Sequence, residues 1–192
     1  MNVEQYYKLA KTENSDINDH LEVLVKYASQ CEHITEFGIR SGNSTKAFLY
    51  SKPKFYRGYD IGKGENDDLL QSLAKENKID FKIIYDSTLN IIIEDTDLLF
   101  IDTYHCFSQI IQELFLHGRK VKKYIIFHDT VSYGTFDEGH CKNCYHPIYL
   151  NNDHFPTFGI MPAINLFMNE TKMFREVENL KTSSGLYIIE KI

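Results

Sequence analysis

The sequence predicts a doubly wound α/β fold, with a mostly parallel seven-stranded sheet covered by helices on both faces. Short apolar runs typical of buried strands alternate with segments whose apolar residues recur at helical spacing. Most of these runs end directly before a polar residue, and open parallel sheets bind ligands at that end of their strands. The last two apolar runs flank residues 182–185 (Thr-Ser-Ser-Gly), which indicates a C-terminal antiparallel hairpin.

The expected elements follow one another along the chain. A helical pattern opens it at residues 16–27, where Ile17, Leu21 and Leu24 are spaced for one helix face. Five strands are expected, at residues 34–37, 55–59, 81–85, 98–101 and 124–127. Helices are expected between several of them, at residues 44–50, 67–76 and 107–116. A further helix beginning near Pro162 precedes the two hairpin runs at 174–180 and 186–189.

The length of the chain fits one domain. All 192 residues are expected to belong to it, with an N-terminal helical segment at residues 1–30. Hydrophobic residues make up 43% of the chain, which is enough for a full core. Residues 132–158 form a long polar and aromatic stretch without a strand or helix pattern. A loop of that length in a compact domain is usually functional or disordered.

Composition and charge exclude several classes of partner. The formal net charge is -6, so nucleic acid is not an expected partner. The sequence shows neither a signal-peptide pattern nor an apolar stretch that could cross a bilayer, so we expect a cytoplasmic protein without a membrane partner. Its cysteines are then expected as thiols. Cys141 and Cys144 form a Cys-x-x-Cys flanked by histidines that could hold zinc, but an unliganded loop is the favoured interpretation.

A glycine-rich segment at residues 34–45 is the most informative feature of the chain. It has the pattern of a strand, a turn containing Gly38 and Gly42, and the start of a helix. About 20 residues further on, the next apolar run ends in Asp60. An acid at that distance is the usual partner of ribose hydroxyls in such sheets, so the two features together predict a cofactor-binding enzyme. An ordinary tight strand-to-helix turn is the simpler alternative.

This segment and four others together resemble the class I S-adenosylmethionine-dependent methyltransferases. Within that class the set is similar to the small metal-assisted O-methyltransferases related to macrocin O-methyltransferase and to the cephalosporin hydroxylase-like proteins. The similar segments cover the chain from about residue 30 onward, in the family's order. They are residues 36–44, 98–105, 125–130, 159–164 and 185–189. The resemblance implies a Rossmann-like methyltransferase fold.

Two positions depart from the pattern of that family. The family usually has Gly after the acid of the fourth strand, where this chain has Thr103. It also usually has a Pro-Gly-Gly turn before the fifth strand, where this chain has residues 121–124 (Val-Lys-Lys-Tyr). The second change should be structural only. The first lies in the predicted crevice and bears on the geometry of the substrate.

The resemblance implies which residues would bind S-adenosylmethionine. Gly38 and Gly42 would let the backbone approach the methionine end, because no Cβ intervenes. Glu36 would hold the turn or meet the amino group of the cofactor. Asp60 would accept hydrogen bonds from the ribose hydroxyls, unless it only caps a helix. The other candidates are Ser44 of the first motif and, on the adenine side, Asp86 and Ser87, for which a capping pair is the alternative.

The catalytic hypothesis rests on polar residues at the ends of the fourth and fifth strands. Asp102 and Asp129 would bind Mg²⁺ or Mn²⁺, which orients a hydroxyl and lowers its pKa. His128 stands where the family often has another acid, so the third ligand is left open. His105 is the expected general base, because imidazole titrates near neutral pH, and Asp102 and His128 complete the catalytic set. The alternative is that His105 only caps a helix and His128 only packs.

The predicted function is methyl transfer from S-adenosylmethionine to a hydroxyl of a sugar or glycoside, with residues 132–158 on the acceptor side. Aromatic and histidine side chains of that stretch suit a small-molecule or glycan acceptor: Tyr133, Tyr145, Tyr149 and His154. One alternative is a metal-dependent hydroxylase-like or hydrolase-like enzyme on the same scaffold. A non-catalytic cofactor-binding module is another. The sequence leaves open whether the chain forms a homo-oligomer.

Overall fold

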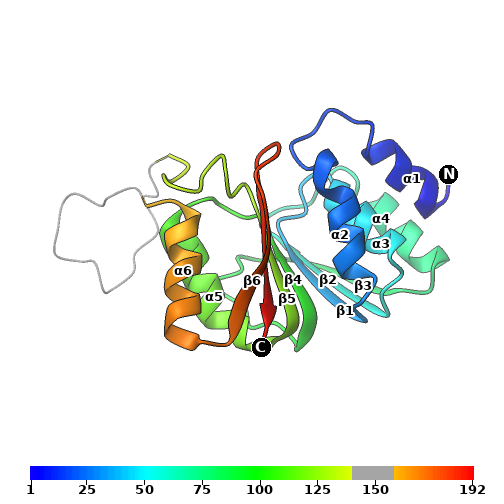
Figure 1. The fold of residues 1–192 in the computed structure, drawn as a ribbon. Helices are drawn as coiled ribbons and strands as arrows, with labels where there is room; N and C mark the ends of the chain where they lie inside the picture. The colour runs from blue at the N-terminus through cyan, green and yellow to red at the C-terminus, as the bar shows by residue number, and fades with distance from the viewer. Residues whose placement is uncertain (140–157) are drawn as a thin grey trace.

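A computed structural model describes residues 1–139 and 158–192, which form one seven-stranded sheet with helices on both faces (Figure 1). The strand order is β3-β2-β1-β4-β5-β7-β6. The strands are β1 His33–Phe37, β2 Phe55–Asp60, β3 Asp80–Tyr85, β4 Thr96–Ile101, β5 Val121–His128, β6 Phe174–Leu180 and β7 Leu186–Lys191.

The pairing of the strands is parallel up to β5 and antiparallel beyond it. β1 lies between β2 and β4, so the chain first builds the sheet in one direction and then in the other. β7 pairs antiparallel with both β5 and β6. The predicted doubly wound, mostly parallel sheet with a C-terminal antiparallel hairpin is therefore confirmed.

The helices divide between the two faces of the sheet (Figure 1). One face carries α1 Val3–Ala10, α2 Leu21–Ala28, α3 Asn43–Tyr50 and α4 Asp67–Glu76. The other carries α5 Phe107–His117 and α6 Ile160–Thr171. Two short 3-10 turns, η1 Asn18–His20 and η2 Gly118–Lys120, precede α2 and β5. Successive residues of the central strands point to opposite faces, so each strand contributes to two apolar cores.

The register of the parallel strands aligns four of their ends. Phe37 of β1 pairs with Tyr59 of β2 and Ile101 of β4, and Ile101 pairs with Phe127 of β5. The residues that follow these four are Gly38, Asp60, Asp102 and His128. They therefore lie in one row at the carboxyl edge of the sheet, where ligands of such folds bind.

Several elements differ from the sequence-based expectations. The helix expected at residues 16–27 is η1 followed by α2, and α1 precedes them. α6 begins at Ile160, before Pro162. Val121 and the three residues after it belong to β5, because Val121 pairs with Thr96 and Tyr124 with Leu98. Residues 140–157, including Cys141, Cys144, Tyr145, Tyr149 and His154, lie outside the described residues, so the zinc alternative stays a prediction. Within residues 1–139 and 158–192, no helix is long and apolar enough to cross a membrane.

Candidate active site

The polar residues at the ends of β4 and β5 form one cluster. His105 Nε2 lies 3.2 Å from Asp102 Oδ1 and 3.0 Å from Asp129 Oδ2. His128 Nδ1 faces the same two carboxylates, 3.5 Å from Asp102 Oδ1 and 3.2 Å from Asp129 Oδ2. Asp129 has a φ of +58°, a left-handed conformation that Asp tolerates better than most residues. The structure thus brings together the four residues named in the catalytic hypothesis.

Glu138 adds a third carboxylate that the sequence analysis missed. Its Oε2 lies 2.9 Å from His105 Nδ1, so a carboxylate faces each nitrogen of that ring. The backbone N–H of Glu138 also donates to the His105 carbonyl at 2.8 Å. The ring of Tyr133 stacks on the imidazole with 4.9 Å between centroids. No local pattern reveals Glu138, because 33 residues separate it from His105 in sequence.

The charges of the cluster shift the pKa of its two histidines and of Asp102 and Asp129. Burial lowers the pKa of His105, but its hydrogen bonds and charge interactions with Asp102 and Asp129 outweigh burial and raise it to about 10. The same two carboxylates raise the pKa of His128 to about 10. Burial raises the pKa of Asp129, yet the two histidines hold it well below its usual range. The imidazoles are therefore cationic at neutral pH whenever they alone balance the carboxylates.

The tautomer of His128 suits it to bind a cation. Its Nε2 lies 3.2 Å from the backbone carbonyl oxygen of Asp16, which can only accept a hydrogen bond, so Nε2 carries a proton. In the neutral ring the lone pair is then on Nδ1, which faces Asp102 and Asp129. One ligand atom from each of these three residues can be chosen so that all lie within 4.8 Å of one another. A carbonyl behind a histidine ligand is a common arrangement in metal sites.

Glu36 lies beneath the glycine turn and is fully buried. Its carboxylate accepts hydrogen bonds from the hydroxyls of Ser44, Thr45 and Tyr56. Burial raises the pKa of Glu36 to about 7, although these three donors oppose the shift. Of the two roles expected for Glu36, its contacts match holding the turn.

The two glycines of the turn have different structural roles. A Cβ on Gly38 would lie 2.0 Å from the carbonyl oxygen of Asp102, so glycine lets the ends of β1 and β4 approach each other. A Cβ on Gly42 would lie 2.6 Å from Leu70 Cδ1. Both residues have positive φ, +82° and +75°. Gly42 is the N-cap of α3 and has no side chain that could accept a hydrogen bond from the first turn of the helix. The N–H groups of that turn are therefore available to a ligand.

Asp60 is bound to the glycine turn. Its Oδ2 accepts hydrogen bonds from the N–H groups of Ile39 and Arg40, at 2.9 and 3.0 Å, and its Oδ1 accepts from Gly62 at 3.2 Å. A carboxylate offers about four lone-pair positions, so at least one remains for a ribose hydroxyl. Asp86 and Ser87 instead form the local turn after β3: Asp86 accepts from Ser87 N and Asn90 Nδ2. These contacts match the capping alternative for that pair.

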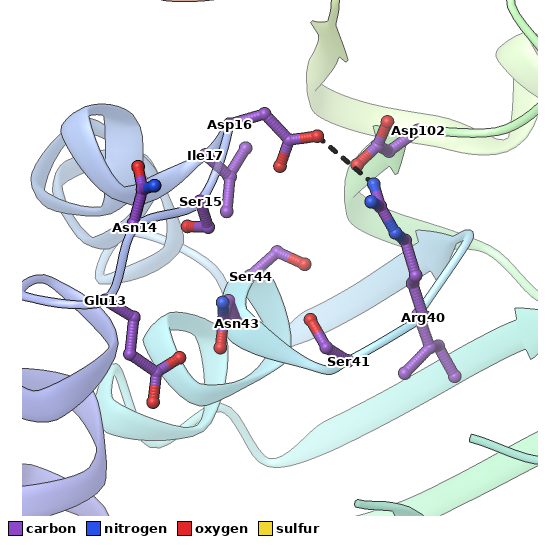
Figure 2. A pocket seen from close by; sticks show the side chains of 11 residues that line it. Glu13, Asn14, Ser15, Asp16, Ile17, Arg40, Ser41, Asn43, Ser44 and Asp102 are labelled. Carbon is purple, nitrogen blue, oxygen red and sulfur yellow. Dashed lines mark hydrogen bonds and ion pairs between the residues drawn. The ribbon is translucent and has the colours of Figure 1, made fainter. Parts of the chain in front are cut away.

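A cavity of about 380 Å³ lies between the glycine turn and the N-terminal segment (Figure 2). Asp102 forms one wall, and Arg40, which pairs with Asp16 at 3.1 Å, crosses beside it. Asp60, Asp86 and Ser87 do not line the cavity. Its lining is otherwise mostly polar and comes from two segments: Glu13, Asn14, Ser15, Asp16 and Ile17, and Ile39, Arg40, Ser41, Asn43 and Ser44.

Comparison with known proteins gives matches in structure alone. No family model and no curated protein matches the sequence. The O-methyltransferase TomG from Streptomyces achromogenes, in complex with S-adenosylmethionine, matches 91% of this chain and 80% of its own, with a TM-score of 0.60 and 11% identity. The N-methyltransferase NodS from Bradyrhizobium japonicum, in complex with S-adenosylhomocysteine, matches 100% of this chain and 99% of its own, with a TM-score of 0.58 and 11% identity.

A third similar structure is an O-methyltransferase family protein from Burkholderia thailandensis. It matches 91% of this chain and 55% of its own, with a TM-score of 0.61 and 9% identity. At these identities the likeness shows the fold. The chain therefore has the Rossmann-like fold that is found in these O- and N-methyltransferases.

Proposed function

We propose that the chain is an S-adenosylmethionine-dependent O-methyltransferase assisted by a divalent cation, akin to the macrocin O-methyltransferase and cephalosporin hydroxylase-like group. The observation that carries the proposal is the position of Asp102. This residue lines the cavity beside the glycine turn and also belongs to the cluster with His105, His128 and Asp129. A methyl donor in the cavity would lie next to groups that can bind an acceptor hydroxyl and remove its proton.

The glycine turn supports the cofactor assignment. The N–H groups at the start of α3 lie at the cavity, where a carboxylate of the methionine end would be stabilised. Ser44 also lines the cavity, while its hydroxyl donates to Glu36. Gly38 and Gly42 keep the turn compact, and Glu36 braces it from below. Asp60 follows β2 on the side of the ribose, with the turn after β3, Asp86 and Ser87, further along the edge.

The cluster supports the metal assignment. Two carboxylates that share one site repel each other unless a positive charge lies between them. Asp102, Asp129 and Nδ1 of His128 would hold Mg²⁺ or Mn²⁺, with the Asp16 carbonyl fixing the ring of His128. A cation there would orient the acceptor hydroxyl and acidify it.

Residues of the chain can also remove the proton of the acceptor hydroxyl. When bound, S-adenosylmethionine supplies a methyl group on a positively charged sulfur. Once a cation balances Asp102 and Asp129, Nε2 of His105 is free to accept the hydroxyl proton. Glu138 accepts from Nδ1–H of His105 and holds the ring. Transfer of that methyl group to the acceptor oxygen, with cleavage of the carbon–sulfur bond, would leave a methyl ether, S-adenosylhomocysteine and His105 protonated at Nε2.

The acceptor we propose is a hydroxyl of a sugar or glycoside. Aromatic side chains lie near His105. Tyr133 stacks on its ring, Phe136 lies edge-on to Tyr133 with 5.8 Å between ring centroids, and the neighbouring Tyr104 is 39% exposed. Such faces stack on sugar rings, while the carboxylates beside them can bond neighbouring hydroxyls. A screen of sugar and phenol acceptors with labelled cofactor tests this, and reaction of phenols alone contradicts the sugar assignment.

Calorimetric titration with S-adenosylhomocysteine tests the cofactor assignment. We expect sub-millimolar binding that Asp60→Ala weakens and that Asp68→Ala, at an exposed acid of α4, leaves unchanged. EDTA should abolish methyl transfer and leave this binding largely intact, because the cation serves the acceptor rather than the cofactor. Absence of binding to the wild-type chain rejects the cofactor assignment. Full transfer in EDTA rejects the metal assignment and leaves His105 as the base, with Asp102 orienting it.

A further inference from the structure

Helix α5 carries a fully buried glutamate, Glu113, that forms no ion pair within the described residues, although the charge of His105 acts on it. Its Oε1 accepts hydrogen bonds from the Thr88 hydroxyl and from Gln109 Nε2, the latter at 2.8 Å. Its Oε2 accepts from the Thr103 hydroxyl at 3.0 Å. Burial raises the pKa of Glu113 to about 7, against the effect of these donors. A buried carboxyl stabilises the fold less than an apolar side chain of the same size would. We therefore look for its role in the groups that its hydrogen bonds hold in place.

Glu113 joins two segments that the sheet keeps apart. Thr103 directly follows Asp102 at the end of β4, and Thr88 directly follows Ser87 in the turn after β3. Two strands, β2 and β1, separate β3 from β4 in the sheet. The segment between β3 and β4 therefore reaches α5, where one carboxyl group holds both threonines.

Thr88 is held by more than one contact, and the residue before Thr103 is confined by the sheet. Gln109 Nε2 donates to Thr88 Oγ1 at 3.1 Å, and the ring of His117 bonds the Thr88 carbonyl through Nε2 at 2.8 Å. On the β4 side, two contacts confine the backbone at Asp102. The carbonyl oxygen of Asp102 lies so close to Gly38 that a Cβ there would be 2.0 Å away, and the next residue, Thr103, is bonded to Glu113. Hydrogen bonds to a buried carboxyl are directional, so they fix where both segments lie.

We propose that Glu113 is a positioning residue for methyl transfer: through Thr103 it sets the catalytic Asp102, and through Thr88 it sets the cofactor-side turn of Asp86 and Ser87. This inference rests on the proposed function. It also gives Thr103, the departure from glycine at this position, a role: its hydroxyl reaches a buried acid that a glycine cannot bond.

Two isosteric substitutions separate the two connections. Thr103→Val and Thr88→Val each remove one hydroxyl and keep the volume nearly constant. We expect Thr103→Val to lower kcat about tenfold or more, since small displacements at a reacting centre carry large rate penalties, while the Kd for S-adenosylhomocysteine stays within about twofold. Thr88→Val should do the reverse and raise that Kd about fivefold with little change in kcat. Thr171→Val is the control, because Thr171 is the last residue of α6; it should change neither kcat nor the Kd.

Substitutions of Glu113 itself complete the test. Glu113→Gln keeps a hydrogen-bonding group between the threonines and should retain most of the activity, whereas Glu113→Leu should combine both losses while the chain stays folded. If both threonine variants lower only the unfolding temperature and leave kcat and Kd unchanged, Glu113 is merely structural and the inference is wrong. If the wild-type chain itself binds no S-adenosylhomocysteine, the proposed function has failed, and the inference fails with it before any variant is measured.

Discussion

Two fully buried glutamates, Glu36 and Glu113, lie behind the candidate site, and neither forms an ion pair within the described residues. Each is bonded by hydroxyl groups instead. A carboxyl in this environment favours its neutral form, so its folded-state pKa exceeds the value in the unfolded chain. The stability of the protein must then depend on pH between those two values.

Replacing Glu36 by Gln should remove part of that pH dependence. The pKa of Glu36 is raised from 4.5 to about 7, so its protonated form stabilises the fold fully below pH 4.5, and this contribution falls away as pH rises toward 7. We expect Glu36→Gln to gain stability relative to the wild-type chain across that window, by up to about 3 kcal/mol. Urea unfolding at pH 4, 5.5 and 8 measures the difference. A difference that is constant with pH contradicts the assignment.

Gly38→Ala should be far more damaging than Gly62→Ala. A Cβ on Gly38 would lie 2.0 Å from the Asp102 carbonyl oxygen, and its φ of +82° disfavours any side chain. A Cβ on Gly62 would meet nothing within 4 Å. We expect Gly38→Ala to lower the unfolding free energy by more than about 3 kcal/mol, and Gly62→Ala to change it by less than about 0.5 kcal/mol. Equal effects in thermal unfolding would show that the close contact between β1 and β4 is not required.

The sequence could predict the members of the site that follow strands, but not those that meet them from elsewhere. Asp102, Asp129 and His128 follow from the rule that polar residues at strand ends converge, and the structure brings them together. Glu138 and the Asp16 carbonyl also contact the two histidines, from segments 33 and 112 residues distant. No periodicity or spacing encodes such contacts, since they depend on how loops return across the edge of the sheet.

At the scale of elements, the predictions held where apolar periodicity was strong. The helix expected at residues 67–76 is α4, and the five expected parallel strands are present with ends shifted by a few residues. α1 lies within the N-terminal helical segment expected at residues 1–30, but its bounds were not predicted, although Asn2 and Gln5 form a capping box that marks its start. That signal is short and polar, and the helix gains its stability from packing on α3, which the sequence alone does not show.

Asp137 should control how α5 and α6 are held together at the site. Its Oδ1 accepts from Phe107 N, the first residue of α5, at 2.8 Å and from Gly159 N, just before α6, at 3.0 Å. Loss of this acceptor removes one hydrogen bond from the Phe107 N–H and one from the Gly159 N–H. We expect Asp137→Ala to lower the unfolding free energy by about 1–2 kcal/mol, and Asp137→Asn, which keeps the oxygen, to lower it less. Equal losses in the two variants would mean that charge matters rather than the shared acceptor.

At the scale of the whole molecule, the segment before α2 and the turn between β6 and β7 come together at the candidate site. The segment before α2 bonds His128 through the Asp16 carbonyl, and His20 lies edge-on to His128 with 5.6 Å between ring centroids. His20 also contacts Thr182 in the turn between β6 and β7. The N-terminal segment and the C-terminal hairpin therefore both support one histidine of the cluster. We expect a change in the charge of the cluster to change the unfolding free energy of the whole protein.

Binding of Mn²⁺ should for that reason raise the unfolding temperature. A ligand that binds only the folded chain at about 100 times its Kd adds about 2.7 kcal/mol, which for a chain of this size is a shift of about 5–10 °C. The shift should be larger at pH 8 than at pH 6, because the carboxylates raise the pKa of His105 and His128 and the cation must displace the protons held there.

Asp129→Asn removes one ligand and should abolish the shift, whereas Asp68→Ala, at an exposed residue of α4, should retain it. The two variants separate binding in the cluster from weak binding to acidic surface groups, since the chain carries a net charge of -6 and attracts cations generally. A shift that persists in Asp129→Asn, or that is independent of pH, places the cation elsewhere on the molecule. In that case the balance of charge between Asp102 and Asp129 rests on His105 and His128 alone.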